Sequence, residues 1–479
     1  KSGGLTVAVM GPNANDSVMQ WGNYNGVPSR TITILEGIRS ALGATDKLIY
    51  EQGCALVENT LLESAFSQCR SENGQGFTAK YWNNMERNGT LAATAQVKTP
   101  FNFCTMGATV FAPGVNLTDF TATYTSVFTP DRTGEVVFEF YVNGVANLLV
   151  DGKEMRGVKA NHGARKMNHL MKVEAEKSYN IQIDFAYNRS DAQLNFDFGY
   201  KEEINIDKSI AKVKDADIIV FVGGISPSLE GEEMGVNLPG FRGGDRTDIE
   251  LPAVQREFIK ALRQAGKKVV FINCSGSPVG LEPETENTDA ILQAWYPGQA
   301  GGKAVADVLF GNYNPAGKLP VTFYRNTAQL PDFENYDIQG RTYRYMTEVP
   351  LFPFGYGLSY TTFRYGNLHV NKTSAKAGET ITLTVPLTNT GKIAGEEVVQ
   401  VYLRKTGDKG GPVKTLRAFK RVGIPAGQTT NVIFELTDKQ FEWWNEKTQS
   451  VEVSPGSFEI LIGGSSKDED LKQINIRTI

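Results

Sequence analysis

The chain has 479 residues, and at about 150 residues per domain this length predicts roughly three domains with separate cores. Its 49 basic and 53 acidic residues give a formal net charge of -4, and no basic run stands out, so nucleic acid and anionic lipid are not predicted partners. No apolar stretch reaches the roughly eighteen residues of a membrane span, whereas 41% hydrophobic residues suffice for buried cores.

Strand and helix alternate in the first block of the chain. Residues 5–10 form an apolar run typical of a buried strand, residues 34–42 repeat at helical spacing, and residues 48–50 predict a second strand. The chain starts at Lys1 without an initiator Met or a signal peptide and reaches its first strand within a few residues. We therefore interpret the N-terminus as a cut end.

The next segment, residues 74–199, loses helical periodicity and alternates with a period of two, as in EVVFEFYVNGVANLLVDGKEM. The dipeptides Asn143-Gly144 and Asp151-Gly152 predict two hairpin turns between short strands. An all-β module is thus expected to interrupt an α/β domain, which is feasible because loop-closure entropy grows slowly with length.

Alternation of strand and helix resumes near residue 204. A helix is expected near residues 210–213, followed by the strand DIIVFVGG, a helix over residues 252–265 that stops at Gly266, and the strands KKVVFINC and AILQAW. Near-continuous apolar strands that alternate with helices are typical of a parallel sheet covered on both faces.

The last block, residues 362–479, again predicts only strands. About seven short strands broken by Gly, Pro and Asn favour an immunoglobulin or fibronectin type of sandwich. Residues 319–360, rich in Pro, Gly and aromatics, are expected to form an ordered connector. The predicted fold is therefore multidomain: an α/β sandwich with a mostly parallel sheet, interrupted by an all-β sandwich and followed by an immunoglobulin- or fibronectin-like β-sandwich.

The residue types available favour carboxylate chemistry. The 4 cysteines lack zinc-ligand spacing, and the 3 histidines, His162, His169 and His369, are scattered along the chain. A histidine-held metal and a Ser-His-Asp triad are therefore not predicted. The Gly-rich turns GPNANDS and GGISPSLEG match no nucleotide-binding fingerprint, so no cofactor is predicted.

Three glutamates follow the strand DIIVFVGG, where ligands of open α/β sheets bind. Glu230, Glu232 and Glu233 lie within four residues of each other, upstream of Asp245 and Arg246. Carboxyl groups that lie together and partly buried hold a proton more readily, which is what a general acid requires. The alternative interpretation is a solvated acidic loop in which Arg246 is a local ion-pair partner.

Two aromatic residues near the end of an expected strand are candidates for stacking on a sugar ring. Trp295 and Tyr296 follow the expected strand AILQA, and a flat aromatic face matches the C–H face of a pyranose ring. The alternative is that these two side chains belong to a core or a domain interface.

Several longer motifs occur together in one order: SPSLEGEEM, PGFRGGDRTDIELPAVQ, AWYPGQAGGKAVADVLFGNYNPAGKLPVTF, GRTYRY and FPFGYGLSYTTF. In this combination the chain resembles glycoside hydrolase family 3. The resemblance implies an α/β-sandwich domain over residues 1–72 plus 204–345, with an inserted anthrax protective antigen-like β-sandwich over residues 73–203. Residues 346–479 resemble the connector and fibronectin type III-like domain of the family.

The same resemblance implies a retaining exo-β-glycosidase that works with two carboxyl groups through a covalent glycosyl-enzyme. Glu230, in the Glu-Gly pattern, is then the general acid/base, with Glu232 and Glu233 as alternates. The nucleophilic aspartate of the family lies in an N-terminal barrel that this sequence lacks. The expected partners are thus an oligosaccharide substrate and that barrel, and the chain alone is expected to be inactive.

The loop and the inserted module most resemble those of bacterial β-xylosidases, with β-glucosidase as the alternative. Calcium-dependent sugar binding is not expected of the inserted module, because it has no Asp-Asp pair. A function of another class, a non-catalytic carbohydrate-binding or adhesive multi-module protein, stays open because β-sandwiches often serve recognition. A periplasmic or secreted location would fit degradation of plant-type oligosaccharides.

Overall fold

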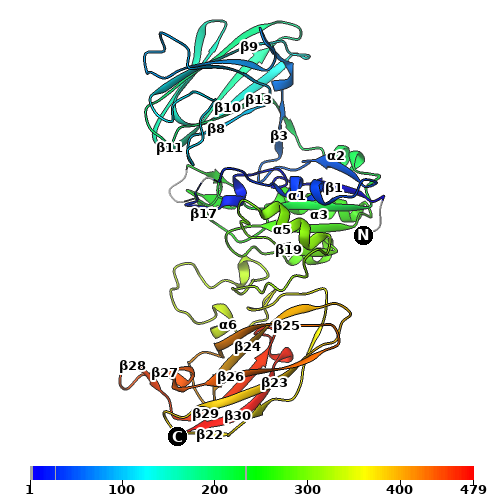
Figure 1. The fold of residues 1–479 in the computed structure, drawn as a ribbon, viewed down its shortest axis with the longest axis vertical. Helices are drawn as coiled ribbons and strands as arrows, with labels where there is room; N and C mark the ends of the chain where they lie inside the picture. Colours follow the sequence, from blue (N-terminus) through cyan, green and yellow to red (C-terminus); the bar gives the residue numbers. More distant parts are fainter. Residues whose placement is uncertain (1–3, 27, 232–234) are drawn as a thin grey trace. The chain divides into compact units, whose positions relative to one another are not determined.

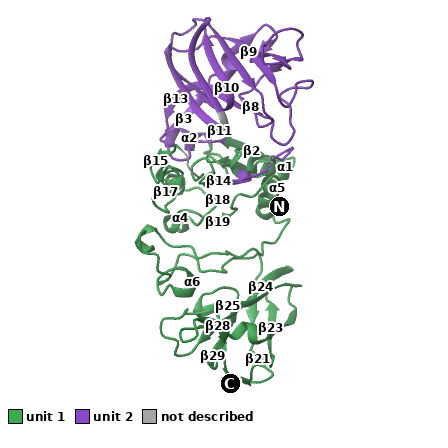
Figure 2. Ribbon diagram, turned by 90° about the vertical axis from the view of Figure 1, so that its left-hand side faces the viewer, with its two compact units in different colours: residues 1–19, 32–50, 213–479 green, residues 20–31, 51–212 purple. Residues whose placement is uncertain are grey.

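The computed structural model describes residues 4–26, 28–231 and 235–479, apart from the side chains of residues 161–163. The chain forms two compact units, which Figure 2 distinguishes by colour. The first unit comprises residues 1–19, 32–50 and 213–479, and the second comprises residues 20–31 and 51–212. Along the described part of the chain, no helix is both long and apolar enough to cross a membrane.

A five-stranded sheet organises the first unit, in the order β2-β1-β14-β18-β19. Its strands are β1 (Thr6–Met10), β2 (Lys47–Glu51), β14 (Ile218–Gly224), β18 (Val269–Cys274) and β19 (Ala290–Gln293). The neighbours β1 and β14, β14 and β18, and β18 and β19 are parallel. The predicted parallel sheet is therefore confirmed.

Helices cover both faces of this sheet (Figure 1). The helices of this unit are α1 (Ile34–Ala41), α3 (Ala253–Gln264), α4 (Glu282–Asn287), α5 (Gly301–Leu309) and the short α6 (Thr342–Tyr345). Val222 of the sheet shares a core with Ile38 of α1 and Val305 of α5. Phe221, which points to the opposite face, packs against Phe258 of α3 at 5.9 Å between ring centroids. This two-faced burial explains why the strands are continuous apolar runs.

Helices α1 and α5 approach each other through two glycines. A Cβ atom on Gly302 would overlap the carbonyl oxygen of Thr33, and one on Gly37 would overlap the carbonyl oxygen of Gly302. Thr33 is also the N-cap of α1, where its side chain accepts a hydrogen bond from the backbone N–H of Glu36. The contact therefore fixes the start of α1 against the first turn of α5.

Gly302→Ala is expected to lower the free energy of unfolding by about 1–3 kcal/mol, because the overpacked atom meets backbone that cannot rotate away. The gain in helix propensity, up to about 1 kcal/mol, works in the opposite direction and is smaller. Denaturant titration followed by circular dichroism measures the change. Gly317→Ala is the control, since a Cβ there meets no atom within 4 Å. Equal midpoints for both variants would contradict the close approach.

The second unit is built on an eleven-stranded sheet, formed by residues that lie in sequence between β2 and β14. Its strands are β3 (Thr60–Ser64), β4 (Cys69–Ser71), β5 (Gly74–Gln75), β6 (Phe77–Trp82), β7 (Ala93–Val97), β8 (Phe101–Cys104), β9 (Phe120–Phe128), β10 (Gly134–Val150), β11 (Lys153–Val173), β12 (Tyr179–Tyr187) and β13 (Gln193–Glu203). Helix α2 (Ile206–Lys212) follows them. The resemblance of residues 73–203 to an anthrax protective antigen-like sandwich stays a prediction.

One of the two predicted hairpin turns in this unit is wrong. Asn143 and Gly144 lie inside β10, where the register with β11 shifts between Val142 and Gly144. A Cβ on Gly144 would come within 2.6 Å of the Phe185 ring, so the glycine marks a bulge with close packing and not a chain reversal. The other prediction is confirmed, because Asp151-Gly152 connects β10 to β11.

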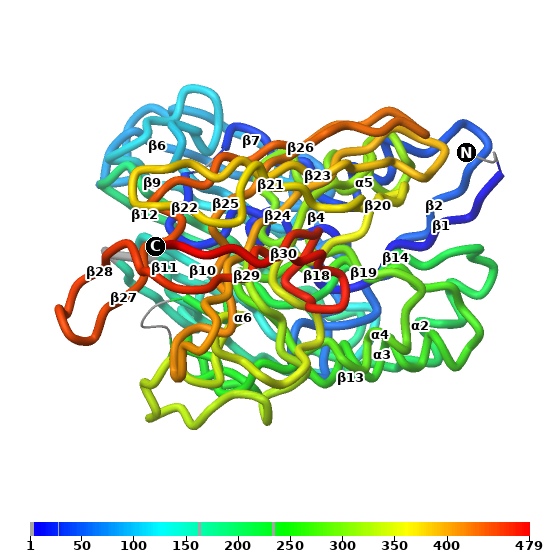
Figure 3. The backbone as a smooth tube through the Cα atoms, turned by 90° about the horizontal axis from the view of Figure 1, so that it is seen from below, coloured from blue at the N-terminus to red at the C-terminus, as the bar shows by residue number. Residues whose placement is uncertain are grey.

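The C-terminal strands form two sheets around one core. One sheet has the order β20-β23-β21 with β26 beside β23, and the other has the order β22-β30-β29-β24-β25. The core contains Leu383 of β23 and Phe434 of β26 together with Val401 of β24 and Ile460 of β29. Figure 3 shows the β27–β28 hairpin extending from these strands. The expected sandwich-like arrangement is thus present.

The bounds of these strands are β20 (Phe363–Tyr365), β21 (His369–Val370), β22 (Ser374–Ala375), β23 (Ile381–Asn389), β24 (Gly395–Lys405), β25 (Thr415–Ile424), β26 (Thr429–Leu436), β27 (Glu442–Asn445), β28 (Ser450–Val453), β29 (Gly456–Gly463) and β30 (Lys472–Thr478). The connector that precedes them is ordered by pairing with itself. The N–H of Leu319 donates to the carbonyl of Tyr356, and the N–H of Phe323 donates to that of Phe352.

Candidate active site

Glu230 lies at the edge of the parallel sheet where the strands end. It belongs to the loop that follows β14, and the strands next in order, β18 and β19, end at the same edge. Because the three strands are parallel neighbours, the loops after them converge there. The structure therefore places the predicted general acid in the position that open α/β sheets use for ligands.

Three donors hold the carboxylate of Glu230. The Tyr296 hydroxyl donates to Oε1 at 2.6 Å, and the backbone N–H of Gly276 donates to the same oxygen at 3.2 Å. The Ser277 hydroxyl donates to Oε2 at 3.3 Å. Gly276 and Ser277 follow β18, and Tyr296 follows β19, so each neighbouring strand contributes to the carboxylate's position.

The base of the loop after β18 is fixed by buried amides. The Asn273 amide donates to Gln293 Oε1 at 2.6 Å, and the Gln293 amide donates to the Ser275 hydroxyl at 3.0 Å. Asn273 and Ser275 are fully buried. This network links the ends of β18 and β19 a few residues before Gly276, Ser277 and Tyr296, which contact Glu230.

Arg246 reaches the site through a small antiparallel sheet. The strands β15 (Asn237–Leu238), β16 (Phe241–Arg242) and β17 (Asp245–Arg246) fold the loop back. Arg246 Nη1 donates to the Ser277 hydroxyl at 3.0 Å and to the Pro278 carbonyl at 2.8 Å. Burial lowers the pKa of Arg246, while the negative charges of Glu230 and Asp248 act in the opposite direction. Arg246 is thus a half-buried side chain that holds the loop after β18, and not a solvated ion-pair partner.

The other acidic residues of the loop do not join Glu230 in the described part of the chain. Glu232 and Glu233 lie outside the described residues. Asp245 is exposed and pairs in register with Arg242 on β16. Of the pattern expected from the sequence, the structure therefore brings together Glu230 and Arg246.

The two aromatic residues after β19 have different surroundings. Trp295 packs edge-on against Phe323, with ring centroids 6.0 Å apart. Tyr296 presents its hydroxyl to Glu230, and burial, followed by the negative charge of Glu230, raises its pKa. Its hydroxyl therefore keeps its proton and acts as a donor. Sugar stacking by this pair stays a prediction, and the contact with the carboxylate was not foreseen.

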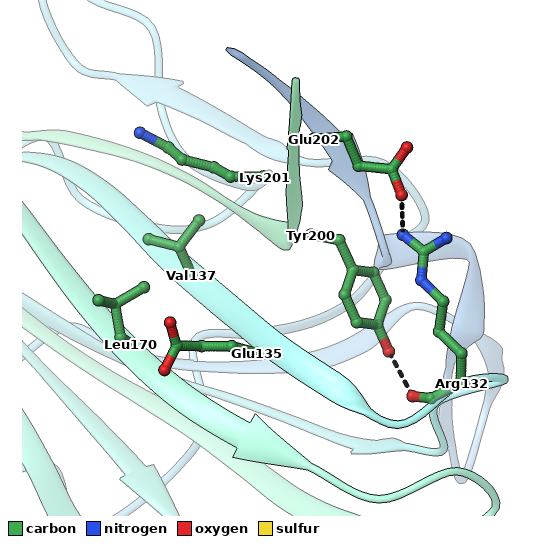
Figure 4. A pocket seen from close by; sticks show the side chains of 7 residues that line it. All are labelled: Arg132, Glu135, Val137, Leu170, Tyr200, Lys201 and Glu202. Carbon is green, nitrogen blue, oxygen red and sulfur yellow. Dashed lines mark hydrogen bonds and ion pairs between the residues drawn. The ribbon is translucent and has the colours of Figure 1, made fainter. Parts of the chain in front are cut away.

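A hollow of about 330 Å³ lies on the second unit, and Figure 4 shows its lining. Arg132 covers the Tyr200 ring at 4.0 Å from its centroid and forms ion pairs with Glu63 at 2.7 Å and Glu202 at 2.6 Å. Lys201 pairs with Glu139 at 3.3 Å. Both cations named here are thus held in ion pairs with glutamates. No cluster suited to a metal ion occurs among the described His, Cys, Asp and Glu residues.

Known families account for most of the chain. Residues 1–360 match the glycosyl hydrolase family 3 C-terminal domain, and residues 397–466 match a fibronectin type III-like domain. The chain belongs to glycoside hydrolase family 3. The resemblance that the sequence motifs indicated is confirmed, and so is the fibronectin-like fold of the C-terminal part.

Relatives of this family 3 chain include enzymes named as xylosidases and enzymes named as glucosidases. It is 46% identical over 475 residues to a xylan 1,4-beta-xylosidase of Xylanibacter ruminicola, covering 98% of this chain and 54% of the relative. It is 29% identical over 507 residues to a beta-glucosidase of Rhizobium radiobacter, covering 96% of this chain and 58% of the relative. The chain thus spans little more than half the length of these relatives.

Among solved structures, the beta-glucosidase of Kluyveromyces marxianus superposes with a TM-score of 0.71 at 24% sequence identity. The match covers 99% of this chain and 60% of that one. At this identity the likeness supports the fold of the chain and says nothing of its substrate.

Proposed function

We propose that this chain supplies the general acid/base, Glu230, of a retaining exo-β-glycosidase acting on terminal β-linked sugars. The observation that carries the proposal is the carboxylate held by Tyr296, Gly276 and Ser277 at the carboxyl edge of the parallel sheet. Donors from two different loops fix one carboxyl group at the edge of the sheet where open α/β folds bind ligands. A solvated acidic loop would need no such contacts.

The chemistry proceeds in two steps. Protonated Glu230 gives its proton to the glycosidic oxygen as the bond from that oxygen to the anomeric carbon breaks, and a carboxylate nucleophile bonds to that carbon. The ionised Glu230 then takes a proton from water, whose oxygen attacks the anomeric carbon and releases the nucleophile. Glu230 ends protonated, ready for the next cycle; the leaving group has gained a proton and the sugar a hydroxyl group, which together are the elements of one water molecule.

The nucleophile is proposed to be an aspartate of a barrel domain that lies outside this sequence. A retaining pair requires two carboxyl groups about 5 Å apart. Glu230 is the member of the pair that we assign within this chain, with Glu232 and Glu233 as alternates. The oligosaccharide and the barrel domain are therefore the partners we propose, in a periplasmic or secreted enzyme.

We infer that the sugar removed is xylose. The 46% identity to the xylan 1,4-beta-xylosidase extends over 98% of this chain, which includes the loop with Glu230. Glucose is the second candidate, because relatives at lower identity, such as that of Rhizobium radiobacter at 29%, are named beta-glucosidases.

Full-length protein, with the barrel, is expected to hydrolyse an aryl β-xyloside with at least about tenfold higher kcat/KM than the matching β-glucoside, since a pocket fitted to xylose excludes the extra hydroxymethyl group. Initial rates on the two substrates measure the ratio. The 479-residue chain alone is the control and is expected to be inactive without a nucleophile.

A reversed ratio would assign the enzyme to β-glucosidases. Sugar binding without hydrolysis by the full-length protein would favour the non-catalytic carbohydrate-binding function. Turnover by the pure chain alone would show that its nucleophile lies among these residues, contradicting the proposed division between two domains.

A further inference from the structure

The contact between Tyr296 and Glu230 has a role beyond holding the side chain in place. Tyr296 is half-buried, and its hydroxyl lies 2.6 Å from Oε1. The N–H of Gly276 reaches the same oxygen at 3.2 Å, and a backbone amide can only donate. Oε1 therefore accepts two hydrogen bonds, one from each neighbouring strand's loop.

A carboxyl oxygen has two lone-pair sites, so an oxygen that accepts two hydrogen bonds has none left for a proton. We infer that Tyr296 is a positioning residue that, together with the Gly276 amide, reserves Oε1 as an acceptor and directs the catalytic proton of Glu230 to Oε2. This inference rests on the proposed role of Glu230 as general acid/base. Oε2 is then the oxygen of Glu230 that faces the glycosidic bond.

The contacts of Oε2 agree with this assignment. Ser277 approaches Oε2 at 3.3 Å, longer than either contact of Oε1. Arg246 Nη1 donates to the Ser277 hydroxyl at 3.0 Å, and a guanidinium cannot accept. The serine must therefore turn its own hydrogen towards Glu230, so Arg246 acts on the carboxyl group through Ser277.

Among the described residues, Tyr296 interacts with this carboxylate by a hydrogen bond and Arg246 by its charge. Asp248 and Glu250 act in turn on the charge of the Arg246 guanidinium. Without the Tyr296 hydroxyl, one lone-pair site of Oε1 is open to the proton, which can then lie on the oxygen turned away from the glycosidic bond. Proton donation to the leaving group should therefore slow.

The test is Tyr296→Phe in the full-length enzyme, with kcat and KM measured separately on aryl β-xylosides of differing leaving group. For a poor leaving group kcat should fall about tenfold with little change in KM, whereas a dinitrophenyl xyloside, which needs little protonation, should change less than about twofold. Ser277→Ala should lower kcat for the poor leaving group by less.

Tyr360→Phe is the matched control, because its hydroxyl also makes a 2.6 Å hydrogen bond, to the carbonyl of Val308. An unchanged kcat for the poor leaving group in folded Tyr296→Phe would overturn the positioning role while Glu230→Gln remained inactive. If Glu230→Gln were active, the proposed function of Glu230 would itself fail. Equal losses for all leaving groups would assign Tyr296 a merely structural role and overturn the inference.

Discussion

Glu230→Gln is expected to lower kcat of the full-length enzyme about 10²- to 10⁴-fold on xylosides whose leaving group needs protonation. Gln keeps the size of the side chain and can still accept from Tyr296 and Gly276, but it has no proton to give. For a dinitrophenyl xyloside, formation of the glycosyl-enzyme should survive, and its hydrolysis should become slow because no base activates water. Stopped-flow measurement of a burst followed by slow turnover would separate these steps.

Azide provides the second part of this test. As an anion it attacks the glycosyl-enzyme without giving up a proton, so it should restore turnover of Glu230→Gln and yield a β-glycosyl azide. Glu286→Gln, an exposed position in α4, is the matched control and should be unaffected by azide. Near-normal turnover of Glu230→Gln would remove the role from Glu230, and the same substitution at Glu232 and Glu233 would then identify the acid.

The sequence predicted well the elements of the first unit's parallel sheet, whose strands are buried on both faces and whose helices are buried on one. Helix α3 covers Ala253–Gln264, within the predicted residues 252–265, because its apolar residues repeat at helical spacing and it follows Pro252. The Asn143-Gly144 dipeptide has the local signature of a turn, yet β10 continues through it. There the strand pairs with β11, β12 and β13. These partners are distant in sequence, so the stabilisation that they provide cannot be recognised from two adjacent residues.

The candidate site was predictable only in part. Glu230 could be placed because acidic residues after a buried strand lie at the ligand-binding edge. Tyr296 and Ser277 also follow strands, but their contacts depend on β18 and β19 being adjacent in the order β14-β18-β19, which periodicity cannot give. Arg246 looked like a local ion-pair partner because the small sheet that returns it to the site has strands of two residues each, too short to show a pattern.

The position of Glu230 depends on the absence of a side chain at residue 276. A Cβ atom on Gly276 would lie 2.8 Å from Glu230 Oε1 and 2.9 Å from Cε2 of the Tyr296 ring, close to both side chains that form the 2.6 Å hydrogen bond. Glu230 presents the far end of a flexible side chain, so it can move aside at little cost in folding energy. The clash should therefore affect catalysis more than stability.

Gly276→Ala is accordingly expected to lower kcat about 10- to 100-fold while the unfolding midpoint stays close to that of the parent, since a displacement of about 1 Å at a reacting group can cost 10²-fold in rate. Kinetics on xylosides of differing leaving group and denaturant titration measure the two effects. Gly235→Ala is the control in the loop that carries Glu230, because a Cβ there meets no atom within 4 Å. Full activity of Gly276→Ala would show that Glu230 does not act from the position in which Tyr296 and Gly276 hold it. A loss of activity confined to substrates with poor leaving groups would show that the added methyl group impairs proton transfer.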